Sequence, residues 1–324
     1  MTIKDRDSFF DNGKFILIVL VVLGHLLPPF TDKDYFIYNL YLFIYSFHMP
    51  AFVFISGFFA KSFTKKENPI REGLKQFIVP YILFQLIYSL FYWLIGINDT
   101  MSFNLIVPNW SLWFLISSFF WRVLLLFFSK IQAILAISIS IVGSLLAGYL
   151  PFIGKELTLQ RTFVFFPFFL MGYYFKKDHM EKFKKSKWKK WFSIILPLIF
   201  IIIYFTSNIN RYYFFGSKPY EDFLNIVELG ALVRLFSLLL GIAGIIGFLG
   251  LVPTKEKFYT KLGKNTLTIY LFHGFIVRLL RHMDFPYSYL DNCPYIITFS
   301  VLLIISLGIV FILSGNFFIK TNEE

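Results

Sequence analysis

Three histidines lie inside long apolar runs, where side chains that exchange protons are rare. His25 follows the run VLVVLG, His48 stands in YSFHMPAF, and His273 stands in IYLFHGF. A neutral imidazole can accept a proton from a hydroxyl group, which is general-base chemistry. A hydrogen bond between helices is the structural alternative for each of them. The three histidines are therefore the first candidates for a reactive site.

His25 has the best surroundings for catalysis. Gly24 beside it permits close approach of another helix, and Pro28 and Pro29 end the helix just beyond it, which suits the mouth of a cavity. We predict that His25 is the general base. His48 and His273 are interpreted mainly as packing residues, with substrate contact as their alternative role.

One carboxylate is a candidate partner for the imidazole. Glu228 lies near the end of an apolar run, at an expected depth similar to that of His25. Arg234 is six residues away, so the two cannot form the usual pair one helical turn apart. We predict that Glu228 orients His25 as a second catalytic residue, and the alternative is a lone carboxylate at the membrane interface.

Two basic clusters precede apolar runs. RDSFFDNGK contains Arg6 and Lys14, and KKENPIREGLKQFIVPY contains Arg71 and Lys75. Guanidinium and ammonium groups bind phosphate strongly, so these residues are predicted to hold the phosphates of a cytosolic cofactor. Cytoplasmic loops of membrane proteins are also rich in Lys and Arg, which is the alternative explanation.

The composition shows which solvent surrounds these residues. Hydrophobic residues make up 57% of the 324, charged residues 15%, and the mean hydropathy is +0.67. Soluble domains have about 45 to 50% apolar residues and about 25% charged ones. The sequence therefore predicts a multi-pass protein of the cell membrane, an all-α bundle that forms a single domain over residues 1–324.

About ten apolar segments approach the ~20 residues that a spanning helix needs. They are Lys14 to Phe30, Tyr35 to Ala60, Phe77 to Ile97, Trp110 to Phe128, Ile131 to Leu150, Thr162 to Phe175, Trp191 to Phe205, Ile226 to Val252, Thr266 to Leu280 and Tyr295 to Ile319.

The basic residues predict the orientation of these spans. With loops assigned to alternate sides, 23 of the 31 Lys and Arg fall on one side and seven on the other, and Arg234 lies within a span. Both termini are therefore expected in the cytoplasm. The loop from Lys176 to Lys190 has eight Lys, which suits anionic lipid headgroups or an anionic substrate. Because the net charge of +12 is explained in this way, no nucleic-acid partner is predicted.

Motifs for metal or nucleotide chemistry are not found. The single cysteine, Cys293, can form neither an internal disulfide nor a cysteine-based zinc site. No Gly-rich phosphate loop or nucleophile elbow occurs. The sequence predicts no metal, and the chemistry has to rest on histidine.

Five fragments occur in an order that resembles a known family. They are RDSFFDNGKFILIVLVVLGH, SFHMPAFVFISGFFAK, SLWFLISSFFWR, RTFVFFPFFLMGYYF and LGKNTLTIYLFHGFIV. Together they resemble the membrane-bound acyltransferase 3 family, closest to its fucose 4-O-acetylase-like branch. The resemblance covers almost the whole chain.

The resemblance implies transfer of an acyl group, usually acetyl from cytosolic acetyl-CoA, to a hydroxyl of a sugar or cell-surface glycan. It places the family's histidine on His25 and its N-terminal arginine on Arg6. A basic residue before the proline of the third helix falls on Lys75, with Arg71 one turn earlier. Substrate contacts are assigned within the same fragments, to His48, Trp113, Arg161 and His273.

Several alternatives stay open at this point. The acyl group can be acetyl or longer, and transfer can be direct or pass through an acyl-histidine. Some relatives carry an extracytoplasmic esterase-like domain, so the chain is expected to act alone, as a homo-oligomer, or with a separate extracytoplasmic partner. The functional alternative is a transporter or exporter of a glycan or lipid-linked substrate.

Overall fold

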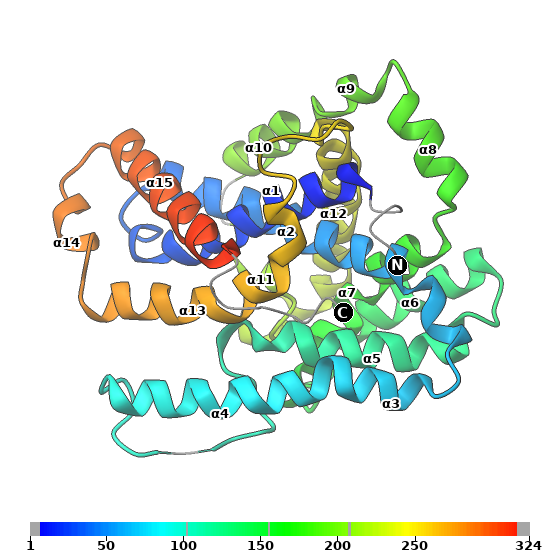
Figure 1. The fold of residues 1–324 in the computed structure, drawn as a ribbon, viewed down its shortest axis with the longest axis horizontal. Coiled ribbons are helices and arrows are strands. Elements are labelled where there is room, and N and C mark those ends of the chain that lie inside the picture. Colours follow the sequence, from blue (N-terminus) through cyan, green and yellow to red (C-terminus); the bar gives the residue numbers. More distant parts are fainter. Residues whose placement is uncertain (1–6, 102, 155, 207–208, 316–324) are drawn as a thin grey trace.

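The computed structural model describes residues 7–315, apart from residues 102, 155, 207 and 208, and all regular structure in that part is helical (Figure 1). The predicted all-α class is confirmed. Ten helices occupy the ten expected segments: α1 (Ser8–Leu26), α2 (Tyr35–Phe59), α4 (Val79–Leu94), α5 (Trp113–Phe128), α6 (Ala133–Ala147), α7 (Leu159–Tyr174), α10 (Ile195–Phe205), α12 (Gly230–Leu251), α13 (Thr266–His282) and α15 (Tyr295–Ser314).

Judged by helix length and hydropathy, the structure has fewer candidate membrane spans than the ten that the sequence predicts. In the part of the chain that the structure describes, six helical stretches can cross a membrane, and a pair bent by 96° is a seventh candidate. Helices α6, α7 and α13 have only 15, 16 and 17 residues, short of the ~20 that a perpendicular span needs. The chain is a helical membrane protein, and the predicted count of about ten spans is not confirmed.

The first two helices begin where the sequence supplies a cap. The Asp7 side chain accepts a hydrogen bond from the Phe9 amide at 3.0 Å, and the Asp34 side chain accepts one from the Ile37 amide at 2.9 Å. Such caps satisfy amide groups that have no partner within the helix. They therefore fix the start of α1 and of α2, which carry His25 and His48.

Close packing of α2 against α7 forms the centre of the bundle. A Cβ atom on Gly57 would lie 2.0 Å from the carbonyl oxygen of Phe169, and one on Gly172 would lie 2.0 Å from that of Phe54. Small residues let two backbones approach in this way. The contact sets the position of Arg161 relative to α2.

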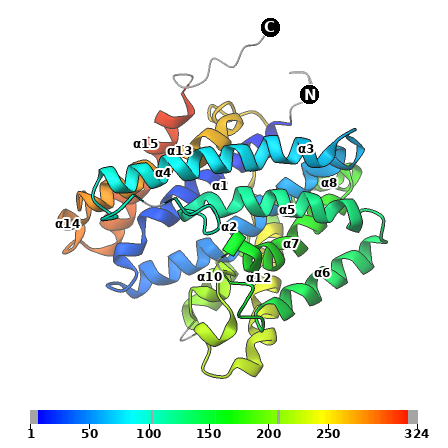
Figure 2. The same cartoon turned by 90° about the horizontal axis from the view of Figure 1, so that it is seen from below.

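The third expected segment belongs to a longer rod. Helix α3 (Pro69–Gly73) continues through a π-helical turn, η4 (Leu74–Ile78), into α4, and Figures 1 and 2 show this rod beside α5. Single π-helical turns occur often at functional sites. Gln76 and Phe77 of this turn line the cavity described below.

Polar contacts join the ends of several helices. Asn12 Nδ2 donates to the carbonyls of Pro253 and Lys255 at 2.9 Å, and Asn265 Nδ2 donates to that of Ser314 at 2.8 Å. The start of α1 thus lies beside the end of α12, and the start of α13 lies beside the end of α15. Which of the two sides faces the cytoplasm stays a prediction.

The basic segment from Lys176 to Lys190 is not a loop, which corrects the sequence-based expectation. It forms α8 (Lys177–Lys185) and the start of α9 (Lys189–Phe192), because Lys and Glu are good helix formers. Met180 is buried, and Lys184 Nζ pairs with Asp7 Oδ2 at 2.6 Å. Helix α8 is therefore tied to the start of α1 at the edge of the bundle.

Candidate active site

A cavity of about 580 Å³ lies between α1, α2, α5, α7 and α13. Its two ends differ in their lining residues. At one end these include Lys14, Gln76, Arg122 and Thr266, and at the other His25, Pro28, Trp110, Arg161 and Arg281. Between them the lining is mostly apolar, with Ile18, Val21, Phe52, Ile55 and Phe114 among its members.

Helix α1 determines the length of the cavity. Lys14 and His25 are eleven residues apart, which is about three turns and about 16 Å of helix. Both side chains therefore lie on one face of α1, and both line the cavity. We call the two regions the Lys14 end and the His25 end.

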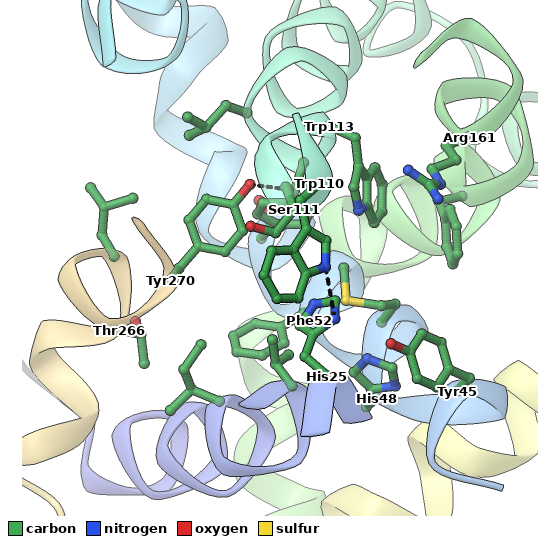
Figure 3. A pocket seen from close by; sticks show the side chains of 18 of the residues that line it. His25, Tyr45, His48, Phe52, Trp110, Ser111, Trp113, Arg161, Thr266 and Tyr270 are labelled. Atoms are coloured by element: carbon green, nitrogen blue, oxygen red, sulfur yellow. Dashed lines mark hydrogen bonds between the residues drawn. The ribbon is translucent and has the colours of Figure 1, made fainter. Parts of the chain in front are cut away.

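His25 is enclosed by aromatic groups. The indole Nε1–H of Trp110 donates to His25 Nδ1 at 3.0 Å, and the two rings lie edge to face with centroids 4.8 Å apart (Figure 3). The His273 ring stacks on His25 with centroids 5.4 Å apart. Arg281 Nη2 donates to the His25 carbonyl.

The bond from Trp110 decides the tautomer of His25. An indole N–H can only donate, so Nδ1 must be the unprotonated nitrogen and the neutral ring carries its hydrogen on Nε2. The lone pair of Nδ1 is the proton-accepting position, and the indole occupies it in this structure.

The chain before Trp110 is held by α4. The Gln85 side chain donates to the carbonyls of Asn104 and Val107, and it accepts the Asn109 amide at 2.7 Å. Trp110 itself has φ of 41°, a conformation that bulky residues rarely adopt. The buried Gln85 side chain therefore positions the segment that leads into Trp110.

His48 lines the cavity and is buried, and its tautomer is also determined. Nδ1 donates to the Ile44 carbonyl at 2.7 Å, which leaves Nε2 as an acceptor. The Tyr45 ring lies edge to face with His48 at 4.7 Å. Tyr45 also packs on Gly24, where a Cβ atom would lie 3.0 Å from its ring. Gly24 permits the close helix contact that the sequence predicted.

His273 does not line the cavity. Its Nδ1 donates to the Ile269 carbonyl at 3.0 Å, and its Nε2 is buried without a hydrogen-bond partner in the described part of the chain. Its stacking on His25 makes it a supporting residue in this structure. The predicted substrate contact of His273 stays a prediction.

Trp113 and Arg161 both line the His25 end. The Arg161 guanidinium lies 4.8 Å from the centroid of the Trp113 ring, and Nε donates to the Phe215 carbonyl at 3.4 Å. Figure 3 shows the two side chains next to each other, on the far side of Trp110 from Tyr270. Their predicted contact with the substrate stays a prediction.

The Lys14 end has two cations. Lys14 Nζ lies 3.3 Å from Asp11 Oδ1 and 4.9 Å from the centroid of the Phe59 ring. Arg122 is buried, lies 4.3 Å from the centroid of the Phe77 ring, and donates to the Ser118 carbonyl at 3.1 Å. Sequence reasoning did not single out Arg122, which lies in the second half of the apolar segment Trp110 to Phe128 and entered only the count of basic residues.

Three other predicted residues lie away from the cavity. Arg71 and Lys75 are exposed and do not line it. Glu228 is also exposed, and in the described part of the chain its side chain makes no hydrogen bond or ion pair, whereas its carbonyl accepts a bond from the Tyr149 hydroxyl. The expected pairing of Glu228 with His25 is therefore not found, because Glu228 lies in a short 3₁₀ turn, Val227–Leu229, before α12 begins. Arg6 lies outside the described residues.

Titratable groups do not gather into a metal site in the part of the chain that was described. No group of three or more His, Cys, Asp or Glu side chains there could hold an ion.

The profile of the acyltransferase domain family, acyltransferase 3, matches residues 7–315. The chain belongs to this family. Membership of this family supports acyl transfer over the transporter alternative. The closeness to the fucose 4-O-acetylase-like branch stays a prediction.

Two curated relatives have the same name, "Nodulation protein NolL". The chain is 30% identical over 193 residues to the protein of Sinorhizobium fredii (strain NBRC 101917 / NGR234), which covers 55% of this chain and 51% of the relative. It is 26% identical over 311 residues to that of Mesorhizobium japonicum (strain LMG 29417 / CECT 9101 / MAFF 303099), which covers 87% and 79%. The match thus spans about half of the first relative's length. No solved structure matches the chain.

Proposed function

We propose that the chain transfers an acyl group, acetyl in the simplest case, from acyl-CoA to a hydroxyl of a sugar or glycan, with His25 as the base. One observation carries the proposal: a single cavity joins the cations of the Lys14 end to the imidazole of the His25 end. Membership of the acyltransferase 3 family supports the reaction class.

The Lys14 end suits the phosphates of the donor. Lys14 and Arg122 supply the positive charge, and Gln76 and Thr266 supply neutral polar groups. Charge-assisted bonds from such cations to phosphate are the strong ones in proteins. The apolar middle of the cavity suits the donor's long flexible arm, so the thioester reaches His25.

The reaction needs a free lone pair on His25. The acceptor hydroxyl replaces the Trp110 indole on Nδ1 and gives its proton to that nitrogen, while its oxygen attacks the thioester carbonyl carbon. The tetrahedral intermediate collapses with cleavage of the carbon–sulfur bond, and the leaving thiolate takes the proton from the imidazolium. The products are an acyl ester and free CoA.

His48 supports this step from the neighbouring helix. Its Nε2 is an acceptor, because Nδ1 donates to the Ile44 carbonyl. A second hydroxyl of the acceptor can donate to it, which orients the sugar relative to His25. His48 is therefore proposed as a substrate-binding residue, and the test is a raised KM for the acceptor in His48→Ala with donor binding unchanged.

The proposal is tested with the full chain in lipid nanodiscs, labelled acetyl-CoA, and glycan from cells that lack the gene. We expect transfer by the wild type and a loss of about 10²- to 10⁴-fold in His25→Ala, the usual contribution of a general base. Binding of labelled acetyl-CoA should persist in that variant. His282→Ala, at the exposed end of α13, is the matched control. Transfer by His25→Ala at the wild-type rate would exclude His25 as the base.

A further inference from the structure

The His25 end of the cavity has positive charge without a protein counter-charge. Arg161 comes from the first turn of α7 and Arg281 from the last turn of α13, and both line the cavity together with His25. No Asp or Glu is among the cavity-lining residues in the described chain. The Lys14 end differs, because Lys14 pairs with Asp11 there.

The two guanidinium groups also keep unused donors. A guanidinium has five N–H donors. In the described part of the chain, Arg161 makes one protein hydrogen bond, a long one of 3.4 Å to Phe215. Arg281 donates to His25, and its Nε is buried without a partner. Both groups can therefore bind a further acceptor of hydrogen bonds.

The position of Arg161 at the start of α7 is a second reason to expect an anionic ligand. The start of an α-helix carries a partial positive charge, which disfavours a cation and favours an anion. The first turn of α7 has no acidic residue that would offset Arg161. An anion next to Arg161 would interact favourably with the guanidinium and with the helix, and the local electrostatics favour such a ligand.

We infer, on the basis of the proposed acyl transfer, that the acceptor carries an anionic group, a phosphate or a carboxylate, which Arg161 and Arg281 bind while a neighbouring hydroxyl reaches His25. The planar fork of arginine matches the oxygens of both groups. A phosphorylated sugar, a uronic acid or a glycan with phosphodiester links has this chemistry. The donor's own phosphates share it, so the test separates the two sources.

The first experiment measures specificity in nanodiscs with labelled acetyl-CoA and two pairs of small acceptors. Methyl glucuronide is compared with methyl glucoside, and glycerol 3-phosphate with glycerol. We expect kcat/KM to be about tenfold to a hundredfold higher for the charged member of each pair. Arg161→Gln and Arg281→Gln should remove this preference and change the rates of the neutral acceptors less. Arg211→Gln, at an arginine that does not line the cavity, is the control.

The second experiment needs no turnover. Inorganic phosphate should raise the unfolding midpoint of the wild type and of Arg211→Gln, because a ligand that binds the folded state stabilises it. The effect should be smaller in Arg161→Gln and Arg281→Gln, and Arg161→Lys should recover part of it. Circular dichroism in nanodiscs checks that each variant folds.

Three outcomes would overturn the inference. Equal kcat/KM for charged and neutral acceptors would show that no anion is recognised. An equal loss of rate on both acceptors in Arg161→Gln would assign that residue to the oxyanion of the transition state. Phosphate stabilisation that disappears in Lys14→Gln but persists in Arg161→Gln would place the anion at the donor. Failure of the proposed function would be seen separately, as an absence of acetyl-CoA binding and turnover. The phosphate titration does not depend on either and would still test the anion site.

Discussion

Replacing Trp110 with Phe removes the indole N–H from His25 Nδ1 and leaves an aromatic ring in place. The ring contact with His25, at 4.8 Å between centroids, and the cation–π contact with Arg278, at 4.6 Å, are kept in weaker form. The backbone φ of 41° is as unfavourable for Phe as for Trp, so the backbone strain is the same in the variant and in the wild type. The variant therefore isolates one hydrogen bond.

That bond is 3.0 Å long, and a neutral hydrogen bond contributes a net free energy of about 0.5 to 1.5 kcal/mol. In the wild type, water and the acceptor hydroxyl must compete with the indole for Nδ1. Without the indole, hydrolysis of acetyl-CoA in the absence of acceptor should rise by about two- to twelvefold. The KM for the acceptor should fall by a similar factor.

The assay measures labelled acetate released from acetyl-CoA by the full chain in nanodiscs. Trp113→Phe is the matched control, because Trp113 lines the same cavity and has no hydrogen bond to His25 among the described contacts. His25→Ala should abolish both hydrolysis and transfer. If acetate release in Trp110→Phe is unchanged or lower, the indole does not mask the base, and the assignment of Nδ1 as the proton acceptor is wrong.

Three further predictions concern packing, the donor and topology. Gly57→Ala forces a Cβ atom to within 2.0 Å of an α7 carbonyl, so we expect the free energy of unfolding in detergent to fall by about 1 to 3 kcal/mol. Gly143→Ala, which has open space around it, should be neutral or slightly stabilising. Equal unfolding midpoints for the two variants would contradict the α2–α7 contact. Arg122→Gln should raise the KM for acetyl-CoA about tenfold to a hundredfold with the acceptor KM unchanged, and an unaltered donor KM would move the phosphates elsewhere. In a cysteine-free background, an impermeant maleimide should label Ser217→Cys but not Ser186→Cys in intact cells, and the reverse pattern would invert the predicted orientation.

The sequence alone determined the membrane character and the place of the helices. Apolar runs bounded by charge and proline give a helix at each expected segment, since helical hydrogen bonds are the way to satisfy the backbone in lipid. The sequence also determined that Lys14 and His25 share one face of α1, because eleven residues make about three helical turns. His25 was found because an imidazole is costly in an apolar run and therefore informative.

Only the tertiary structure decided which other residues meet His25. Trp110, Arg281 and His273 come from positions 85 to 256 residues away in the chain, and helices that are apolar on most sides carry little pattern that tells which face meets which partner. Packing of α13 against α1 brings His273 and Arg281 to His25, and the short turn that begins at Trp110 packs against α13. Glu228 does not reach the cavity because it lies in a short 3₁₀ turn that ends before α12 begins. The composition of the apolar run does not show where this turn ends and the helix starts. Arg122 turns into the cavity because it lies within α5 and stacks on Phe77, a contact between segments about 45 residues apart.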